Sequence, residues 1–285
     1  MSNKNKVIAF QGALGANSDM ACRDAFPGMI TLPCRTFSDA FLAVRRGEAN
    51  LAMIPVENSV AGRVADIHRL LPESGLFIIG EYFLRINFHL FALKGASLKN
   101  ITHVHSHIHA LPQCSEFIEK WDFNPVVHGD TAGAAQDVAK WHDLTQGAIS
   151  TSLAGNLYGL TCLASDIENT DKNTTRFLVM AYEPSTIDPN SKHLMTTFVF
   201  RVRNLPAALY KALGGFATNG VNMTKLESYI QGDFVAAQFY ADVEGHPDQV
   251  GLLNAFEELK FFTHSIHILG TYPTHLYRRE SMEDV

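Results

Sequence analysis

The chain has 285 residues, of which 46% are hydrophobic and 18% are charged, and its formal net charge is −6. This length predicts about two globular domains, and the acidic balance disfavours a nucleic-acid-binding protein, which usually carries a basic patch. No apolar run approaches the ~20 residues that span a membrane, and the polar N-terminus is unlike a signal peptide, so we expect a cytoplasmic protein without a membrane partner.

The first 183 residues alternate short apolar strands with helical segments. Strands are expected at 7–10, 51–54, 76–79, 86–93, 125–128, 147–150 and 175–180, and helices at 19–25, 37–46, 64–71, 110–121, from 130 onward, and 153–158. This alternation is typical of a mainly parallel α/β architecture. A crossing near 82–93 and a return near 165–175 predict two lobes with a cleft between them.

A glycine-containing loop at 11–18 follows the first strand and precedes the first helix. This arrangement presents backbone N–H groups to an anion. Gly12 and Gly15 lie three residues apart, but the full dinucleotide fingerprint is missing. We therefore favour a carboxylate or phosphate loop over a nucleotide site.

Polar side chains also gather at the ends of later strands. Glu57, Asn58 and Ser59 follow the strand at 51–54, and Thr131 opens a helix after the strand at 125–128. Helix capping would explain Ser59 and Thr131, but it explains Glu57 and Asn58 less well. Because the ends of several strands can lie at the same edge of a sheet, the alternative to capping is that these side chains line one shared cleft.

Thr175 and Arg176 lie directly before the apolar run 177–180. Arginine offers a planar, permanently charged fork for a carboxylate, and the neighbouring threonine can donate a hydrogen bond to a leaving oxygen. The simpler interpretation is a turn with a surface charge. The pattern alone leaves both open, and the polar clusters elsewhere favour the first.

Four histidines alternate along 103–109, and alternate positions on a strand share one face. A metal site is conceivable, but no nearby carboxylate or cysteine completes it. We interpret the segment as a strand end that leads into a helix, and we expect no metal. The four cysteines, Cys22, Cys34, Cys114 and Cys162, have no paired spacing, so we expect reduced thiols in the core.

The pattern changes after a turn-rich linker at 182–192. Strands are expected at 195–202, 221–230, 234–243 and 262–269, helices at 206–218 and 247–259, and a hairpin turn at 231–233. The order βαββαβ is that of a ferredoxin-like unit. Because this domain, at 194–275, carries no cluster of acid–base residues, we expect a regulatory or assembly module.

Taken together, these motifs resemble one family, the bacterial prephenate dehydratases with a C-terminal ACT regulatory domain. The resemblance covers nearly the whole chain and is carried by 10–18, 55–62, 106–114, 130–135 and 167–177. The sequence departs from the family pattern at Asn17, Ile108, His109 and Asn169. The resemblance implies a two-lobed, periplasmic-binding-protein-like catalytic domain at 1–183 and an ACT domain at 194–275.

The resemblance also implies a reaction, in which prephenate loses water and carbon dioxide to give phenylpyruvate for phenylalanine biosynthesis, without metal or organic cofactor. It assigns the departing hydroxyl to Thr175 as the catalytic residue. The residues that it implies for substrate binding are Glu57, Asn58, Ser59, Ser106, Gln113, Thr131, Arg176 and Phe177. Arg176 and helix N-termini suit a substrate with two carboxylates.

In the second domain, 206–209 and 220–228 resemble the family's phenylalanine-binding motifs, with Ala207 in place of a glycine and Tyr229-Ile230 in place of Arg-Pro. The resemblance implies L-phenylalanine as an effector and a homodimer or homotetramer. The implied effector-binding residues are Ala207, Ala208, Leu209, Asn222, Glu227 and Ser228.

Three alternatives compete with this hypothesis. An arogenate dehydratase would perform the same chemistry on an aminated substrate. A non-enzymatic amino-acid sensor would keep Arg176 but would not need Thr175. A metal-dependent hydrolase using the histidines is excluded if activity survives chelation.

Overall fold

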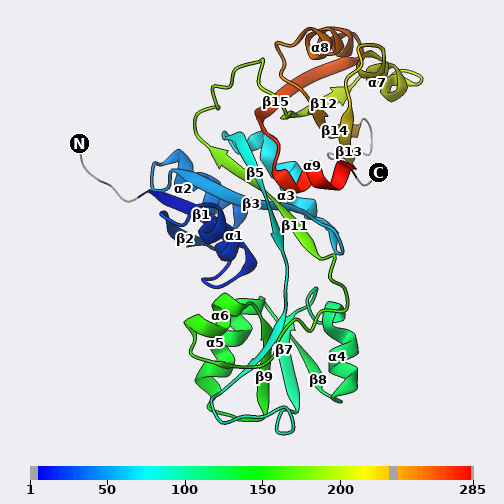
Figure 1. Cartoon of the computed structure of the whole chain (residues 1–285). Helices are drawn as coiled ribbons and strands as arrows, with labels where there is room; N and C mark the ends of the chain where they lie inside the picture. The colour runs from blue at the N-terminus through cyan, green and yellow to red at the C-terminus, as the bar shows by residue number, and fades with distance from the viewer. Residues whose placement is uncertain (1–5, 231–236, 284–285) are drawn as a thin grey trace, which may run out of the picture. The chain divides into compact units, whose positions relative to one another are not determined.

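The structure, a computed structural model, describes residues 6–230 and 237–283 (Figure 1). The hairpin turn expected at 231–233 lies outside these residues. The chain divides into two compact units. One comprises the residues up to Ala43, Glu48–Arg63 and Phe83–Phe177, and the other comprises Val44–Gly47, Val64–Tyr82 and the residues from Leu178 onward. Within the described ranges, no helix is both long and apolar enough to cross a lipid bilayer.

The first sheet, sheet A, has the strand order β2-β1-β3-β11-β5, and β4 pairs with β3. Its strands are β1 (Val7–Gln11), β2 (Ile30–Cys34), β3 (Leu51–Asn58), β4 (Gly62–Arg63), β5 (Phe77–Arg85) and β11 (Thr174–Ala181). The helical segments between them are α1 (Asn17–Ala25), α2 (Phe37–Arg45), α3 (Ala65–Leu70) and the 3-10 helix η1 (Leu71–Glu73). Ile8, Ala9 and Phe10 of β1 are fully buried, as expected for a central parallel strand covered on both faces.

The second sheet, sheet B, has the order β10-β6-β9-β7-β8. Its elements are β6 (His89–Ala92), β7 (His103–His107), η2 (Pro112–Cys114), α4 (Ser115–Lys120), β8 (Asn124–His128), α5 (Thr131–Trp141), β9 (Gln146–Ser150), α6 (Ser152–Leu157) and β10 (Thr161–Ala164). Helices α5 and α6 lie on one side of sheet B and α4 on the other (Figure 1). The single helix expected at 110–121 is instead a 3-10 turn, in which the N–H groups of Gln113 and Cys114 donate to the carbonyls of Ala110 and Leu111, followed by α4.

Both strand directions occur within these sheets, so the expectation of a mainly parallel architecture is only partly correct. β1 is parallel to β2 and β3, and β7 is parallel to β8 and β9, whereas β6 is antiparallel to β9 and β10. The chain enters sheet B through an extended segment, without the helical crossover that parallel neighbours need. β6 therefore runs antiparallel to β9, whereas β7, β8 and β9, which helices connect, are parallel to one another.

The segments that cross between the two sheets are paired with each other. The Ile86 N–H donates to the Asn173 carbonyl at 2.8 Å, and the Ile167 N–H donates to the Phe88 carbonyl at 2.9 Å. The Glu168 carboxylate accepts the Phe88 N–H at 2.9 Å. The outgoing and returning chains thus form one short, hydrogen-bonded connection.

The third sheet, sheet C, is antiparallel, with the order β13-β14-β12-β15. Its elements are β12 (Leu194–Val202), α7 (Ala208–Thr218), β13 (Met223–Ile230), β14 (Ala237–Glu244), α8 (Val250–Phe262) and β15 (Thr263–Pro273), followed by α9 (Leu276–Glu283). α7 and α8 pack on one face of sheet C. Phe216 of α7 and Phe256 of α8 form a single core there with Phe198 and Phe200 of β12. The expected fold class, a two-lobed α/β region followed by a βαββαβ module, is confirmed; α9 is an addition that the sequence did not predict.

The segment 64–82 belongs to the same unit as sheet C, although the sequence placed it in the N-terminal domain. A Cβ at Gly270 of β15 would lie 2.0 Å from the carbonyl oxygen of Ile78 in β5. Glu81 of β5 accepts two hydrogen bonds from the Arg278 guanidinium, at 3.0 and 2.9 Å. Backbone contact and ion pairing therefore join β5 to β15 and α9.

Candidate active site

The end of β3 lies beside the beginning of β11. The Ser59 N–H donates to the Thr174 carbonyl at 2.9 Å, and the Ser59 hydroxyl accepts the Thr174 N–H at 2.9 Å and donates to the Lys172 carbonyl at 2.5 Å. β11 therefore begins where β3 ends, and the two strands run in opposite directions. This pairing brings Glu57 and Asn58 next to Thr175 and Arg176, so two clusters that lie more than a hundred residues apart form one site.

Four side chains form a chain of hydrogen bonds that ends at Thr175. Gln113 in η2 accepts through Oε1 from Asn173 Nδ2 at 2.5 Å, and Asn173 accepts through Oδ1 from Asn58 Nδ2 at 2.7 Å. The same Asn58 nitrogen donates to Thr175 Oγ1 at 2.9 Å. Asn173 is 1% exposed, so the centre of this network is shielded from water.

The direction of these hydrogen bonds is determined by the turn that follows β3. Asn58 Oδ1 accepts the N–H groups of Val60, at 2.9 Å, and Ala61, at 2.7 Å. Its side-chain nitrogen must therefore face Asn173 and Thr175, and both of its hydrogens are used. Thr175 Oγ1 is an acceptor in this contact, and it has no acceptor of its own among the residues that the structure describes. Its hydroxyl hydrogen can be donated to a ligand.

Arg176 is 1% exposed, and its Nη1 donates to Glu57 Oε1 at 3.0 Å. The Glu57 side chain is 33% exposed. A permanently charged guanidinium in a shielded environment interacts strongly with nearby carboxylates. Phe177, the next residue, is 1% exposed. The structure therefore places its ring in the core.

Ser106 and Thr131 occupy sheet B and the start of α5. The buried Ser106 hydroxyl donates to the Ile149 carbonyl at 2.6 Å and so joins β7 to β9. The cap of α5 is Asp130, whose Oδ1 accepts the Gly133 N–H at 2.6 Å, so the expectation that Thr131 caps this helix is wrong. The Thr131 hydroxyl forms no hydrogen bond within 6–230 and 237–283, and it can therefore bind a ligand.

The glycine loop after β1 packs against α6. Thr151 Oγ1 donates to the Gly15 carbonyl at 2.5 Å, and a Cβ at Gly15 would lie 2.8 Å from Ala154 Cα. The Gly15 N–H donates to Asp19 Oδ2 at 2.8 Å and the Gly12 N–H to the Cys34 carbonyl at 3.0 Å. These two N–H groups are occupied within the protein, so they do not support the expected anion loop.

A family model for prephenate dehydratase matches residues 8–185, which include every residue of this site. The chain belongs to the prephenate dehydratase family. It therefore belongs to a group of dehydratases, which are lyases of aromatic amino-acid biosynthesis.

Relatives of the family resemble the chain over nearly all of its length. A bifunctional N-acyl-homoserine lactone acylase/prephenate dehydratase of Komagataeibacter europaeus is 49% identical over 279 residues, covering 98% of this chain and 99% of the relative. Arogenate dehydratase 2 of Petunia hybrida is 35% identical over 282 residues, covering 94% and 71%. The crystal structure of a prephenate dehydratase from Arthrobacter aurescens in complex with L-Phe superposes with a TM-score of 0.86 at 28% identity, covering 94% and 90%.

Asn173 and Glu168 were not among the residues expected at the site of this prephenate dehydratase family member. Asn173 is the centre of the network that orients Thr175, and Glu168, whose side chain is 3% exposed, holds the crossing segment at Asn87 and Phe88. Both residues lie within the 167–177 motif that carried the family resemblance. A buried polar residue inside a specific motif was the signal that could have identified them.

The residues expected to bind an effector lie at the start of α7 and on or directly before β13. Ala207 has a φ of 57° and precedes α7, where Ala208 is buried. Glu227 forms an ion pair with Lys225 at 2.8 Å, and its Oε2 lies 3.7 Å from Nε2 of His68 in α3. Asn222 and Ser228 are exposed and Leu209 packs against the core of sheet C. Because neighbours on a strand point to opposite faces, Glu227 and Ser228 cannot both face one ligand from the same side.

The histidines of β7 contact other side chains of unit 1. His105 Nε2 lies 2.7 Å from Gln146 Oε1, and burial lowers the pKa of His105 and that of His107. Among the residues described, no group of three or more His, Cys, Asp or Glu could hold a metal ion. The cysteines are free thiols; Cys22 and Cys114 are buried, which raises the pKa of each, but Cys162 is exposed, so the expectation of a core thiol is wrong there.

Proposed function

We propose that the chain converts prephenate into phenylpyruvate. The bond between the ring and its carboxylate breaks, the electron pair enters the ring, and the ring hydroxyl leaves with a proton as water. The prephenate dianion and one proton thus yield the phenylpyruvate monoanion, carbon dioxide and water. Aromatisation drives the reaction, so positioning the substrate and supplying one proton are the tasks left to the protein.

The orientation of the Thr175 hydroxyl is the observation that supports this proposal most directly. Its oxygen accepts from Asn58, which leaves its hydrogen for the departing hydroxyl. A threonine hydroxyl is a weak acid, so Thr175 acts as an oriented donor and relay, and solvent resupplies the proton. The hydrogen bond from Asn58 stabilises negative charge that develops on Oγ1 during this transfer.

Arg176 supports the assignment of a dianionic substrate. Its buried guanidinium already pairs with Glu57, and its planar fork also suits a substrate carboxylate beside Thr175. In our proposal Arg176 anchors one carboxylate, while Thr131 and the N-terminus of α5 contact the other end of the substrate. Glu57, Asn58, Ser59, Ser106 and Gln113 hold the surrounding backbone and side chains in place.

The test is a steady-state assay of phenylpyruvate formation with Thr175→Val, which retains the shape of the side chain and removes the hydroxyl. We expect kcat to fall by about 10²-fold or more, the usual effect of losing a positioned proton donor, while KM changes little. Thr175→Ser should retain most activity, and Thr174→Val, one residue away, is the matched control. Near-wild-type turnover of Thr175→Val would refute the role of Thr175. Prephenate binding without turnover by the wild-type chain would instead support the sensor hypothesis.

We further propose prephenate as the preferred substrate over arogenate. The two differ in one side-chain group, a ketone in prephenate and an ammonium in arogenate, and relatives carry both names. Initial rates on the two substrates, measured side by side, decide between them. A higher kcat/KM for arogenate would make the chain an arogenate dehydratase with the same site.

L-phenylalanine is the proposed effector, acting between paired C-terminal modules of a homodimer or homotetramer. The complex of the Arthrobacter aurescens relative with L-Phe supports this. Binding should raise the melting temperature through linkage and reduce turnover. Calorimetry that detects no heat of phenylalanine binding at millimolar concentration would refute the effector, and analytical ultracentrifugation tests the assembly.

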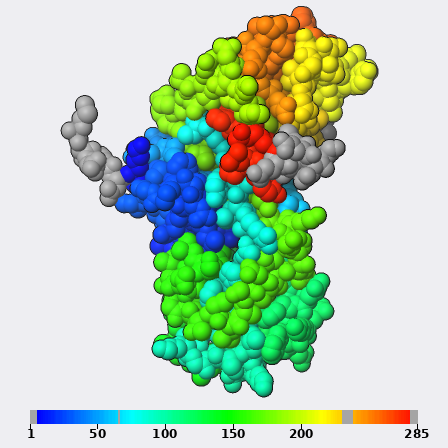
Figure 2. All heavy atoms as spheres, viewed as in Figure 1, coloured from blue at the N-terminus to red at the C-terminus, as the bar shows by residue number. Residues whose placement is uncertain are grey.

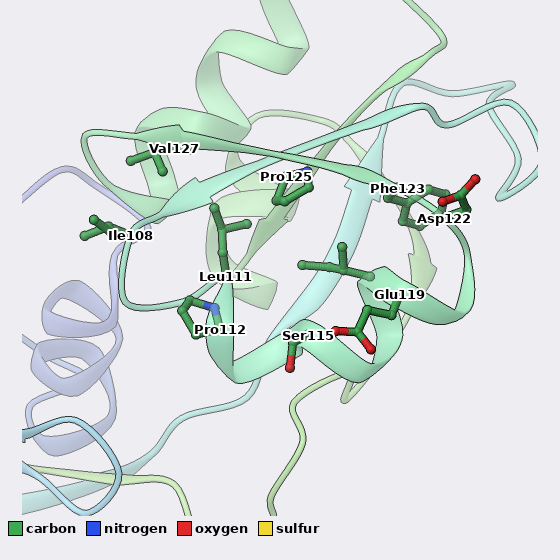
Figure 3. A pocket seen from close by; sticks show the side chains of 10 residues that line it. Ile108, Leu111, Pro112, Ser115, Glu119, Asp122, Phe123, Pro125 and Val127 are labelled. Atoms are coloured by element: carbon green, nitrogen blue, oxygen red, sulfur yellow. The ribbon is translucent and has the colours of Figure 1, made fainter.

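A second candidate activity, hydrolysis of N-acyl-homoserine lactones, is favoured by an apolar cavity on sheet B. The cavity measures about 480 Å³, and Leu111 and Pro112 face Pro125 and Val127 across it (Figure 3). Its acidic residues are Glu119 and Asp122, and no cation lines it. These properties suit a neutral acyl chain better than an anion, and the Komagataeibacter europaeus relative carries this activity in its name.

Release of homoserine lactone from an N-acyl-homoserine lactone is the measurement for this second activity. In Val127→Asp, a charge enters the cavity, so lactone release should fall while prephenate turnover is retained. No release by the wild-type chain, or equal release by this variant, would contradict the cavity's role.

A further inference from the structure

A second cavity lies in the C-terminal unit, where the end of the linker, sheet C and α9 meet. It has a volume of about 410 Å³, and its lining includes Lys192, His193, Glu244, Thr274 and Arg279. Figure 2 shows α9, in red, at the surface next to the yellow-green linker. This volume is within the ~300–1,000 Å³ of small-molecule sites.

This cavity is separate from Ala207, Ala208 and Leu209, three of the residues expected to bind phenylalanine, whereas the Asn222 carbonyl accepts the N–H of Glu244 in the lining at 3.0 Å. It adjoins Leu194, the first residue of β12, whereas α7 follows the last residue of that strand, Val202. A strand of this length spans about 26 Å at the usual rise per residue. A ligand in the cavity therefore does not contact Ala207, Ala208 or Leu209.

Two buried hydrogen-bond donors of the cavity lining have no partner. They are Nε of Arg279 and Oγ1 of Thr274, and neither forms a hydrogen bond among the residues that the structure describes. The Thr274 backbone is satisfied, because its N–H donates to the His193 carbonyl at 2.8 Å. A buried donor without a partner is unfavourable, and two such donors on residues that line one cavity indicate an acceptor that binds there.

The charges around the cavity indicate which charged groups the ligand carries. Arg278 is neutralised by Glu81, with contacts of 3.0 and 2.9 Å. Lys192 and Arg279 form no ion pair within the described part of the chain, and neither does Glu244, the one carboxylate in the lining. The free charges are thus two positive and one negative, which suits a ligand with a carboxylate and an ammonium group.

We propose that this cavity binds a free α-amino acid. Arg279 and Thr274 donate to its carboxylate, Lys192 adds positive charge, and Glu244 receives its ammonium group. The site belongs to the C-terminal unit and is independent of the dehydratase reaction, so it would constitute a second amino-acid-binding site on the chain.

The experiment measures the melting temperature of the full-length chain with each of the twenty L-amino acids at millimolar concentration, followed by calorimetry on those that raise it. For at least one amino acid, we expect Arg279→Gln to weaken binding roughly 10- to 100-fold, the effect of losing a charged hydrogen bond. Arg201→Gln, an exposed arginine outside the cavity, should bind like the wild-type chain. Inorganic phosphate and the deaminated analogue of the same amino acid should bind at least tenfold more weakly.

Thr274→Val is a second variant that tests the site even if Arg279→Gln fails to fold. It removes a buried unpaired hydroxyl, so the melting temperature without ligand should not fall, while the rise caused by the amino acid should shrink. The proposal is wrong if no amino acid binds in a way that Arg279→Gln and Thr274→Val both weaken. Equal binding of phosphate or of the deaminated analogue would also overturn it, because the site would then recognise an anion alone.

Discussion

At the scale of single residues, the hydroxyl of Thr175 depends on the amide of Asn58. That amide gives both hydrogens to Asn173 and Thr175 and uses its oxygen for two backbone N–H groups. A carboxylate of nearly the same shape has no hydrogens to give. It would attract the Thr175 hydrogen to itself, so the hydroxyl would point away from the substrate.

We therefore expect Asn58→Asp to lower kcat for prephenate about as much as Thr175→Val, by about 10²-fold or more, although the hydroxyl is still present. Steady-state kinetics measure this, and circular dichroism checks the fold. The double variant Asn58→Asp/Thr175→Val should be no slower than either single variant, since both remove the same donor. Full turnover in Asn58→Asp would show that the direction of this hydrogen bond is unimportant.

Ala207 is strained in the left-handed region, with φ at 57° just before α7. A Cβ in this conformation costs about 1–2 kcal/mol, whereas glycine adopts it freely. Ala207→Gly should therefore raise the free energy of unfolding by about 1 kcal/mol, which urea denaturation measures. A lower stability would mean that the greater freedom of glycine in the unfolded chain outweighs the relief of strain.

At the scale of elements, β15 approaches β5 backbone to backbone at Gly270. A Cβ there would lie 2.0 Å from the Ile78 carbonyl oxygen and 2.8 Å from its carbonyl carbon. Gly270→Ala must push the strands apart, and we expect a loss of about 1–3 kcal/mol or more in stability. Gly214→Ala is the matched control, because a Cβ there meets nothing within 4 Å and alanine favours the helix. Equal stability of the two variants in thermal denaturation would refute the contact.

At the scale of the whole molecule, the division of the chain decides what a truncation does. The boundary expected at residue 183 predicts that a chain ending at Tyr182 folds and remains active. The structure groups 64–82 with the C-terminal unit and buries the Glu81 carboxylate, whose side chain is 0% exposed, against Arg278. Without Arg278, this buried ion pair is broken beside exposed apolar surface, a cost of about 3–5 kcal/mol.

The truncated chain should accordingly aggregate or unfold at a much lower temperature, with little prephenate turnover. Size-exclusion chromatography, thermal denaturation and the phenylpyruvate assay check this. A monodisperse fragment with wild-type turnover would show that 64–82 folds with the N-terminal residues alone.

The sequence by itself determined most elements of secondary structure, the fold class and the two polar clusters at 57–59 and 175–176. Local hydrophobic periodicity carries that information, since the alternation of buried and exposed positions is set by each element's own geometry. The helix expected at 206–218 and the strand expected at 195–202 were recognisable for this reason. β2, β4, β10 and α9 escaped notice because their apolar patterns are short and weak.

Only the tertiary structure decided which way the Thr175 hydroxyl points and how Arg176 is paired. The first depends on Asn58, Asn173 and Gln113 and the second on Glu57. The antiparallel pairing of β3 with β11 and the crossing segments bring these residues together. The tertiary structure also decided that 64–82 packs with sheet C and that Thr274 and Arg279 line one cavity. No local pattern encodes such contacts, because they depend on strand order, register and the path of the chain between distant elements.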